Sequence, residues 1–275
     1  MINLPKLNYE EVLIQISNFL KKCLENSKAK GYVIGISGGI DSATTAYAAC
    51  KALGNEKLFA LIMPEKGLTP EEDLNDAINV CNTLNLKYEI IEINEIKKSF
   101  LNSVKIEADY KTIGNLSPRI RMTLLYYYAN SMNYLVLGTG DKSEILIGYF
   151  TKYGDGGVDV LPLADLYKTQ VREFASFLGV PQKIINKKSS PRLWPEHEAE
   201  KEIGISYDIL DKILYGLVDL ELSPKVIAEK LNIEIDTIIK IKERILNAEH
   251  KRRGPIMLQL SLKSVETGYR LPVQF

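Results

Sequence analysis

The stretch "YVIGISGGIDSATTAYAACKALG", residues 32–54, contains a short apolar run, a bend of small residues and a second apolar run. The first run predicts a buried strand over residues 32–36, and the second predicts a helix over residues 42–53. The first N–H groups of a helix have no intrahelical partners and lie at the positive end of the helix dipole. The bend between the two elements is therefore suited to bind an anion.

The bend "SGGIDS", from Ser37 to Ser42, favours a polyphosphate ligand over a simple turn. Its two glycines permit close approach of the backbone, and its two serines add hydroxyl donors. Asp41 is itself an anion, and it tolerates a neighbouring phosphate when a divalent cation lies between them. We therefore expect ATP together with Mg²⁺ at this loop. A tight turn in which Asp41 only caps the helix is the alternative.

Two other phosphate-binding motifs are excluded by the residues that follow the bend. The P-loop requires Gly-Lys-Ser/Thr after its glycines, and the chain has Ile40-Asp41-Ser42 there. The dinucleotide-binding fingerprint requires a third glycine in step, which is missing.

The composition restricts the class of protein further. The chain has 275 residues with 35 basic and 35 acidic side chains, so it lacks the global positive field of a nucleic-acid-binding protein. Its three cysteines are far apart, which argues against a zinc site or a disulfide framework. No apolar run is long enough to span a membrane, and the N-terminal residues do not resemble a signal peptide. We expect a cytoplasmic protein that binds neither nucleic acid nor membranes.

Alternation of apolar runs with amphipathic segments predicts an α/β fold. In addition to residues 32–36, we expect strands at residues 57–63, 87–93, 134–140 and 158–163. Five such strands predict a doubly wound, mainly parallel five-stranded sheet. Ligands of these sheets bind at the carboxyl ends of the strands, and here those ends carry the polar and glycine-rich residues 37–41, 63–66 and 138–144. One cleft is implied.

Two segments are expected to begin helices. The run Thr69-Pro70-Glu71-Glu72 has the pattern of a capping box with proline at the first helical position, and its helix should extend to about residue 84. The pair Ser117-Pro118 repeats this arrangement before the helical pattern "RIRMTLLYYYANSMN".

Residues 223–253 contain two helical patterns joined by "NIE" and end in a basic cluster, an arrangement that resembles a helix-turn-helix. A DNA-reading second helix would need exposed basic residues. The second pattern instead carries the apolar residues Ile235, Ile238, Ile239, Ile241 and Ile245. We therefore favour a packed helical hairpin, and a nucleic-acid-binding protein is the alternative of a different class.

Longer motifs resemble one enzyme family. The loop "SGGIDS" is similar to the pyrophosphate loop of N-type ATP pyrophosphatases. "GYFTKYGDGGVDVLPLADLYKTQV" (residues 148–171) resembles the signature region of NAD⁺ synthetases, as do "GNLSPRIRM" (114–122), "SSPRLWP" (189–195) and "AEHKRRGP" (248–255). The resemblance covers nearly the whole chain and implies a single synthetase domain, with an α/β ATP-binding core over residues 1–185, a lid-like loop over 186–202 and a helical region over 203–275.

The resemblance implies roles for individual residues. The ATP-binding positions are Gly35, Ile36, Ser37, Gly38, Gly39, Ile40, Asp41, Ser42, Thr139, Lys168 and Ser190, and the Mg²⁺ ligands are Asp41 and Glu144. The positions that match deamido-NAD⁺ binding are Arg119, Lys152, Asp159, His250 and Lys251. Asp41, Lys152 and Asp159 are the expected catalytic residues.

The implied reaction is the ATP-dependent amidation of deamido-NAD⁺ by ammonia. A carboxylate oxygen of the dinucleotide attacks the α-phosphate of ATP and gives an acyl adenylate and pyrophosphate. Ammonia then attacks the activated carbonyl and releases AMP and NAD⁺. Only residues 1–31 precede the first predicted strand, so free ammonia is expected in place of a glutamine-hydrolysing domain. The resemblance also implies a homodimer.

Some positions depart from the family pattern. Pro118 stands where many relatives have alanine, and His197 and Ala199 stand at glutamine and aspartate positions, so ligand contacts of residues 196–200 are not carried over. Asp141 and Lys142 receive no role. Another ATP pyrophosphatase that adenylates a different acceptor, such as a tRNA-modifying ligase or an amidotransferase synthetase subunit, is the enzyme alternative.

Overall fold

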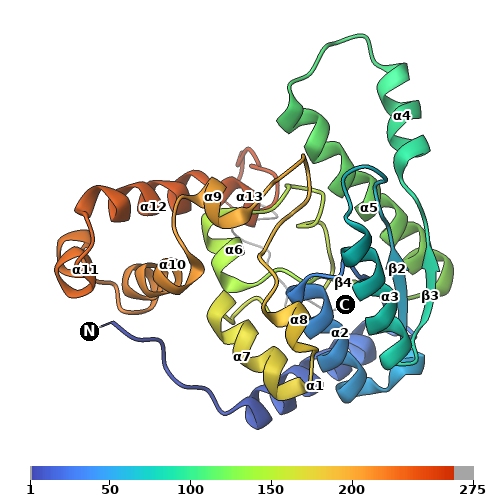
Figure 1. Ribbon diagram of the computed structural model, residues 1–275, viewed down its shortest axis with the longest axis horizontal. Coiled ribbons are helices and arrows are strands. Elements are labelled where there is room, and N and C mark those ends of the chain that lie inside the picture. Colours follow the sequence, from blue (N-terminus) through green and yellow to red (C-terminus); the bar gives the residue numbers. More distant parts are fainter. Residues whose placement is uncertain (1, 263–275) are drawn as a thin grey trace.

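A parallel sheet forms the centre of the computed structural model, which describes residues 2–262 (Figure 1). Its strands are β1 (Tyr32–Gly35), β2 (Leu58–Ile62), β3 (Lys87–Ile90) and β4 (Leu135–Leu137). They pair in the order β3-β2-β1-β4, and every pairing is parallel. The strands β2 and β3 lie on one side of β1, and β4 lies on the other side. The order in which successive strands are added therefore reverses between β1 and β4. The predicted α/β class is confirmed.

The expected number of strands was wrong, because residues 158–163 do not form a regular strand. Val160 makes a single parallel bridge with Leu137. Beside it, the Asp159 carboxylate accepts the Val136 N–H at 2.8 Å and thereby occupies a donor of β4. Pro162, two residues after Val160, has no N–H to continue a ladder. The described residues therefore contain a four-stranded sheet with one additional bridge.

Both faces of the sheet are covered, as the alternation of side chains in β1 requires. Tyr32 and Ile34 face a cluster formed with α1 (Tyr9–Ser27), α2 (Ile40–Leu53), α3 (Glu71–Thr83) and α7 (Lys168–Leu178). Val33 faces the opposite cluster, formed mainly with α5 (Tyr110–Met132), beside which α4 (Asn94–Ser103) packs. The short elements of this region are η1 (Asn55–Lys57), α6 (Lys142–Ile147) and α8 (Gln182–Ile185).

The expected helix after Thr69 is present as α3, but the predicted capping by Thr69 and the predicted helix start at Ser117-Pro118 were wrong. Both hydroxyl groups instead contact Glu65, Thr69 at its backbone N–H and Ser117 at its carboxylate. The helix α3 begins at Glu71, and the Thr69 hydroxyl accepts the Glu65 N–H at 2.9 Å instead of capping the helix. Ser117 and Pro118 lie inside α5, whose N-cap is Asp109. The Ser117 hydroxyl donates to Glu65 Oε2 at 2.6 Å. Tertiary partners thus override the local capping pattern.

The C-terminal helices form a second assembly beside the sheet domain. They are α9 (Ala199–Ile203), α10 (Tyr207–Leu214), a π-helical turn (Tyr215–Asp219), α11 (Pro224–Leu231), α12 (Ile235–Asn247) and α13 (Glu249–Arg252). Their core includes the buried residues Leu214, Ile227 and Ile238. The hairpin of α11 and α12 is therefore packed through its apolar residues, as expected.

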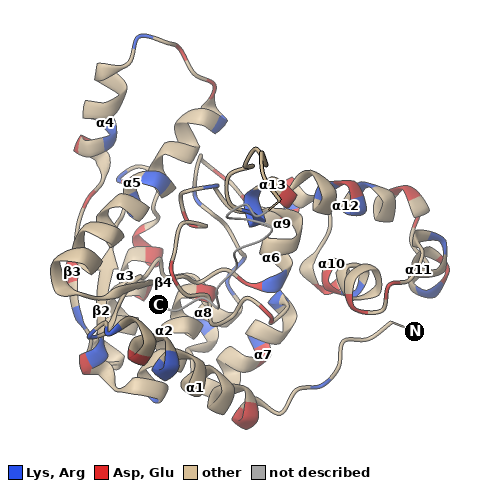
Figure 2. Ribbon diagram, turned by 180° about the vertical axis from the view of Figure 1, so that it is seen from behind, with Lys and Arg blue, Asp and Glu red and all other residues tan. Residues whose placement is uncertain are grey.

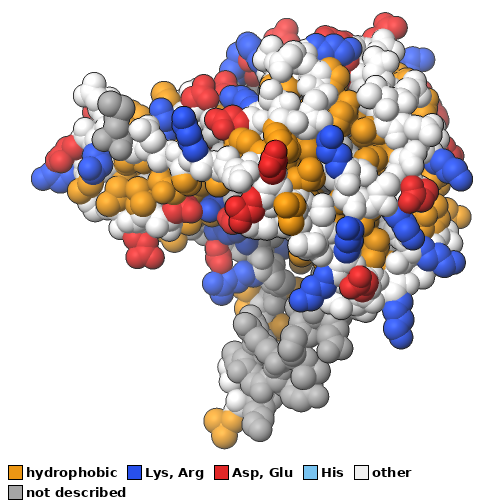
Figure 3. Space-filling model, turned by 90° about the horizontal axis from the view of Figure 1, so that it is seen from below, with side chains coloured by type: hydrophobic (Ala, Val, Ile, Leu, Met, Phe, Trp, Pro, Cys, Tyr) orange, Lys and Arg blue, Asp and Glu red, His pale blue; other side chains and the backbone are white. Residues whose placement is uncertain are grey.

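The surface mixes charges and apolar side chains. Lys and Arg are interspersed with Asp and Glu over the molecule (Figure 2). Hydrophobic side chains gather at the end of the molecule formed by α10 to α12, as the view from below shows (Figure 3). Over residues 2–262, no helix combines the length and apolar character needed to cross a membrane.

The Glu65 network gives a stability prediction. Glu65 Oε1 lies 2.6 Å from Lys97 Nζ, and both residues are buried. Replacing Glu65 by glutamine leaves a buried ammonium without its counter-charge, so the free energy of unfolding should fall by about 3 kcal/mol in urea denaturation. Glu95→Gln, which removes an exposed partner 3.9 Å from Lys98, is the control and should leave stability unchanged. Equal stability of the two variants would contradict a structural role for the buried pair.

Candidate active site

The predicted phosphate loop is a compact turn at the carboxyl end of β1. Gly38 adopts φ +78°, and the Ser37 and Ser42 hydroxyls lie 3.1 Å apart. Ser42 Oγ also donates to the Gly39 carbonyl at 3.0 Å. Gly39 is the N-cap of α2 and supplies no side-chain cap. The N-terminus of α2 is therefore available to an anionic ligand.

The loop lines a cavity of about 440 Å³ at the carboxyl ends of the strands. The opposite walls come from α5, from residues 148–151 and from the segment 187–194. This position lies where the strand order reverses, between β1 and β4, which is the usual ligand site of open parallel sheets.

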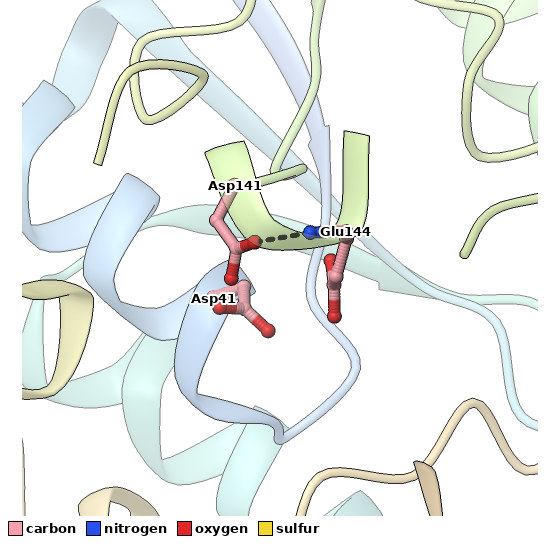
Figure 4. A group of neighbouring side chains, drawn as sticks. All are labelled: Asp41, Asp141 and Glu144. Carbon is pink, nitrogen blue, oxygen red and sulfur yellow. Dashed lines mark hydrogen bonds between the residues drawn. The ribbon is translucent and has the colours of Figure 1, made fainter. Parts of the chain in front are cut away.

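Three carboxylates surround the buried ammonium of Lys168. Lys168 Nζ lies 2.7 Å from Asp41 Oδ2, 2.8 Å from Asp141 Oδ2 and 2.8 Å from Glu144 Oε1. Asp41 comes from α2, Asp141 and Glu144 from the start of α6, and Lys168 is the first residue of α7. One oxygen atom from each carboxylate lies within 4.8 Å of the others (Figure 4). We call Asp41, Asp141, Glu144 and Lys168 together the carboxylate cluster.

The carboxylate cluster contains three acidic groups and one basic group. Burial, with the neighbouring acids, raises the pKa of Asp141 to about 6 and raises that of Glu144 well above its ordinary value. Burial alone would lower the pKa of Lys168, but the three carboxylates raise it well above its ordinary value. With all four groups ionised, three negative charges face one positive charge.

The residues present fit a divalent cation. Asp41 Oδ1 is buried and has no hydrogen-bond partner among the described residues. All donors of the cluster are carboxylate oxygens, which are the ligands that Mg²⁺ prefers. A doubly charged ion would also remove the excess negative charge.

Most of the predicted ATP and metal positions meet at the cavity. Its lining includes Gly35, Ile36, Ser37, Gly39, Ile40, Asp41, Ser42, Thr139, Glu144, Ser190 and, from the dinucleotide set, Lys251. Lys168 lies behind the lining, where it is fully buried and holds Asp41 and Glu144. Gly38 does not line the cavity, and a Cβ added to it would point at the Asp73 carbonyl oxygen.

The remaining predicted dinucleotide positions lie outside this lining. Arg119 is exposed and donates to the Lys152 carbonyl at 3.4 Å, and Lys152 Nζ lies 5.3 Å from the centre of the Tyr153 ring. His250 is exposed on α13. Asp159 is occupied by hydrogen bonds from the Val136 N–H and from Tyr126 Oη. The structure does not bring these four side chains together with the carboxylate cluster.

Sequence reasoning missed Asp141 and Lys187. Asp141 caps α6 by accepting the Glu144 N–H at 2.8 Å, and the D-x-x-E spacing is a local signal of such a cap. Lys187 contacts the Gly38 carbonyl at 3.2 Å and Asp73 Oδ1 at 2.8 Å, which ties the segment after α8 to the phosphate loop. No local pattern marks that contact.

The segment that follows Lys187 is held by aromatic and polar contacts. The rings of Trp194 and His197 stack with centroids 3.5 Å apart. His197 Nε2 lies 2.7 Å from Glu202 Oε2 and 3.1 Å from Tyr149 Oη, and burial lowers the pKa of His197. The Ser190 hydroxyl donates to the His197 carbonyl. His197 therefore fixes this wall of the cavity.

Comparison with known proteins identifies the family. A model of the NAD synthase family matches residues 12–255. The NH(3)-dependent NAD(+) synthetase of Hyperthermus butylicus is 49% identical over 249 residues, which are 90% of this chain and 90% of that protein. The chain belongs to the NAD synthase family. This relationship supports ammonia-dependent NAD⁺ synthesis and favours neither another ATP pyrophosphatase nor a nucleic-acid-binding protein.

Solved structures of NAD synthase relatives share the fold. An NMN synthetase from Francisella tularensis superposes with a TM-score of 0.82 at 32% identity and covers 93% of this chain and 100% of its own. An NH3-dependent NAD synthetase from Campylobacter jejuni gives a TM-score of 0.76 at 32% identity, with 92% of this chain and 100% of that chain covered.

The shape of the phosphate loop predicts the effect of one added methyl group. A Cβ at Gly38 would lie 2.1 Å from the Asp73 carbonyl oxygen, and its φ of +78° disfavours other residues. We expect Gly38→Ala to weaken the binding of ATP at least tenfold in calorimetric titration, because the loop must move. Gly179→Ala is the matched control, since Gly179 has φ +87° with no atom within 4 Å of its added Cβ. Equal ATP affinity in both variants would contradict the expectation that the contact with Asp73 displaces the phosphate loop.

Proposed function

We propose that Asp41, Asp141, Glu144 and Lys168 form the ATP-activating centre for the amidation of deamido-NAD⁺ by ammonia. The observation that carries this proposal is the carboxylate cluster, which lies directly beside the open N-terminus of α2. The loop amides and Ser37 would bind the phosphates of ATP, and Thr139 and Ser190 would contact the same nucleotide.

The proposed reaction has two steps, adenylation of the carboxylate and attack by ammonia. An oxygen of the nicotinate carboxylate forms a bond to the α-phosphorus of ATP, and the bond to the bridging oxygen breaks, which releases pyrophosphate. Ammonia then forms a bond to the acyl carbon, AMP leaves with its oxygen, and one proton is released. Both steps depend on positioning and charge neutralisation, which fixed amides and cations supply.

The cluster residues prepare this site for the charged nucleotide. Asp41, Asp141 and Glu144 would hold Mg²⁺, which when bound would neutralise phosphate charge. Lys168 keeps Asp41 and Glu144 oriented toward each other, and its ammonium lies close enough to the cavity wall to balance added negative charge. The part of the proposal that concerns Mg²⁺ rests on the three neighbouring carboxylates and on the buried, unpartnered Oδ1 of Asp41.

The dinucleotide would extend beyond the cavity. Lys251 lines the cavity, and its Nζ donates to the Gly148 and Phe150 carbonyls at 2.7 Å each. Arg119, Lys152, Asp159 and His250 are not among the residues that line this cavity. We retain these four as proposed dinucleotide contacts in a homodimer whose second chain completes the outer part of the site. In addition to this proposed contact, Asp159 would hold β4 and α5 in place, because its carboxylate accepts hydrogen bonds from the Val136 N–H and from Tyr126 Oη.

The other parts of the proposal concern organisation and location. Residues 186–202 are proposed to act as a lid between the α/β core and the helical region, and the protein is expected to work in the cytoplasm.

The activity itself gives the first test. We expect NAD⁺, AMP and pyrophosphate to appear in equal amounts from ATP, Mg²⁺, ammonium and deamido-NAD⁺. Asp41→Asn and Glu144→Gln should each lower kcat at least 100-fold, because each removes a charge that faces Lys168. Asp208→Asn, on an exposed side chain of α10, should retain activity. AMP formation without NAD⁺ would refute the acceptor but leave the ATP site standing.

The acceptor needs a separate test, because one structural relative is an NMN synthetase. We expect kcat/KM to be at least tenfold higher for deamido-NAD⁺ than for nicotinate mononucleotide, measured with both acceptors in one mixture. A preference for the mononucleotide would make amidation of that smaller acceptor the correct function.

A further inference from the structure

The helix α10 reaches the back of the carboxylate cluster through one buried carboxylate. Asp211 is fully buried. Its Oδ1 accepts the Ser143 hydroxyl at 2.6 Å, and its Oδ2 accepts the Thr169 N–H at 2.8 Å. Ser143 Oγ in turn accepts the Lys168 N–H at 2.9 Å. Asp211 therefore joins the first turn of α6 to the first turn of α7.

The joined residues are direct neighbours of the cluster residues. Ser143 precedes Glu144 in α6, and Thr169 follows Lys168 in α7. At the start of α6, the N-cap Asp141 and Glu144 lie close to Asp41, whereas the Ser143 hydroxyl contacts Asp211 of α10. One side of this helical turn therefore faces the cavity, and the other side contacts Asp211.

The same helix supports Lys168 through an aromatic ring. Tyr207 lies one turn before Asp211, and the centre of its ring is 5.2 Å from Lys168 Nζ. Its buried hydroxyl has no hydrogen-bond partner among the described residues. Together, Tyr207 and Asp211 make α10 the support for the start of α7.

Packing alone does not explain an aspartate at this position. Burial raises the pKa of Asp211, which reflects the cost of placing a carboxyl group there. An apolar residue of similar size would join α10 to its neighbours without this cost. A carboxylate provides what an apolar residue cannot, namely two acceptors of fixed separation that set the position of two helix starts and complement their dipoles.

We propose that Asp211 is a positioning residue for the ATP-activating centre. It holds the starts of α6 and α7 in register, so that Glu144 and Lys168 meet Asp41 in the geometry that phosphoryl transfer requires. Small displacements of such groups lower reaction rates strongly. The inference rests on the proposed function for its catalytic consequence, whereas the placement of Lys168 is independent of which acceptor is amidated.

The test separates positioning from stability. Asp211→Leu removes both acceptors at similar side-chain size, and Asp211→Asn keeps one. We expect Asp211→Leu to slow the first turnover of pyrophosphate release, measured with deamido-NAD⁺ in the absence of ammonia, by at least tenfold. The burst amplitude, which counts folded sites, should remain that of the unchanged chain. Asp211→Asn should give an intermediate rate, and it serves as the test if the leucine variant does not fold.

A matched control and a second measurement complete the experiment. Ile213→Ala opens a cavity on the same helix, facing the C-terminal core, and should lower the thermal unfolding temperature without slowing the burst. In calorimetric titration with ATP and Mg²⁺, Asp211→Leu should bind at least tenfold more weakly and Ile213→Ala unchanged. A normal burst rate with normal ATP affinity in Asp211→Leu, or equal slowing by Ile213→Ala, would overturn the proposal. Failure of the unchanged chain to make NAD⁺ would refute the proposed function, while the titration would still decide the role of Asp211.

Discussion

The contact of one buried ammonium with three carboxylates is the constraint on which this site depends. A fully buried lysine keeps its charge only when anions lie within contact distance. The anions of Lys168 come from α2, which follows β1, and from the start of α6, which follows β4. They can meet because β1 and β4 are neighbours in a parallel sheet, so that both chain segments leave the sheet at the same edge.

Sequence could predict the parts of the site that are local. The loop from Ser37 to Ser42 was readable because strand, glycines and helix follow within one short stretch, and the structure places it as expected. Asp141 was not assigned, although its capping pattern is local, because its importance depends on Asp41 and Lys168. These two residues are 127 positions apart in the chain, and no periodicity relates them.

Local patterns were misleading where tertiary partners compete for the same groups. Thr69 and Ser117 have the chemistry of N-caps, yet both hydroxyls are used by Glu65. The segment around Val160 has the apolar character of a strand, yet the Asp159 carboxylate takes a donor of β4 that a neighbouring strand would need. The deamido-NAD⁺ positions show the same limit, since motif matching gives residue identity but does not determine which cavity a side chain faces.

Buried charge recurs at the ends of elements in this protein. Glu65 links the end of β2 to α4 and α5, Lys168 links α7 to α2 and α6, and Asp211 links α10 to α6 and α7. Hydrophobic burial is non-directional and would tolerate sliding of these helices over the sheet. Each buried charge requires particular partners at particular distances, so it specifies the relative position of elements that apolar packing leaves free. In this fold the residues that bear charge inside the molecule therefore determine where the chemistry can occur.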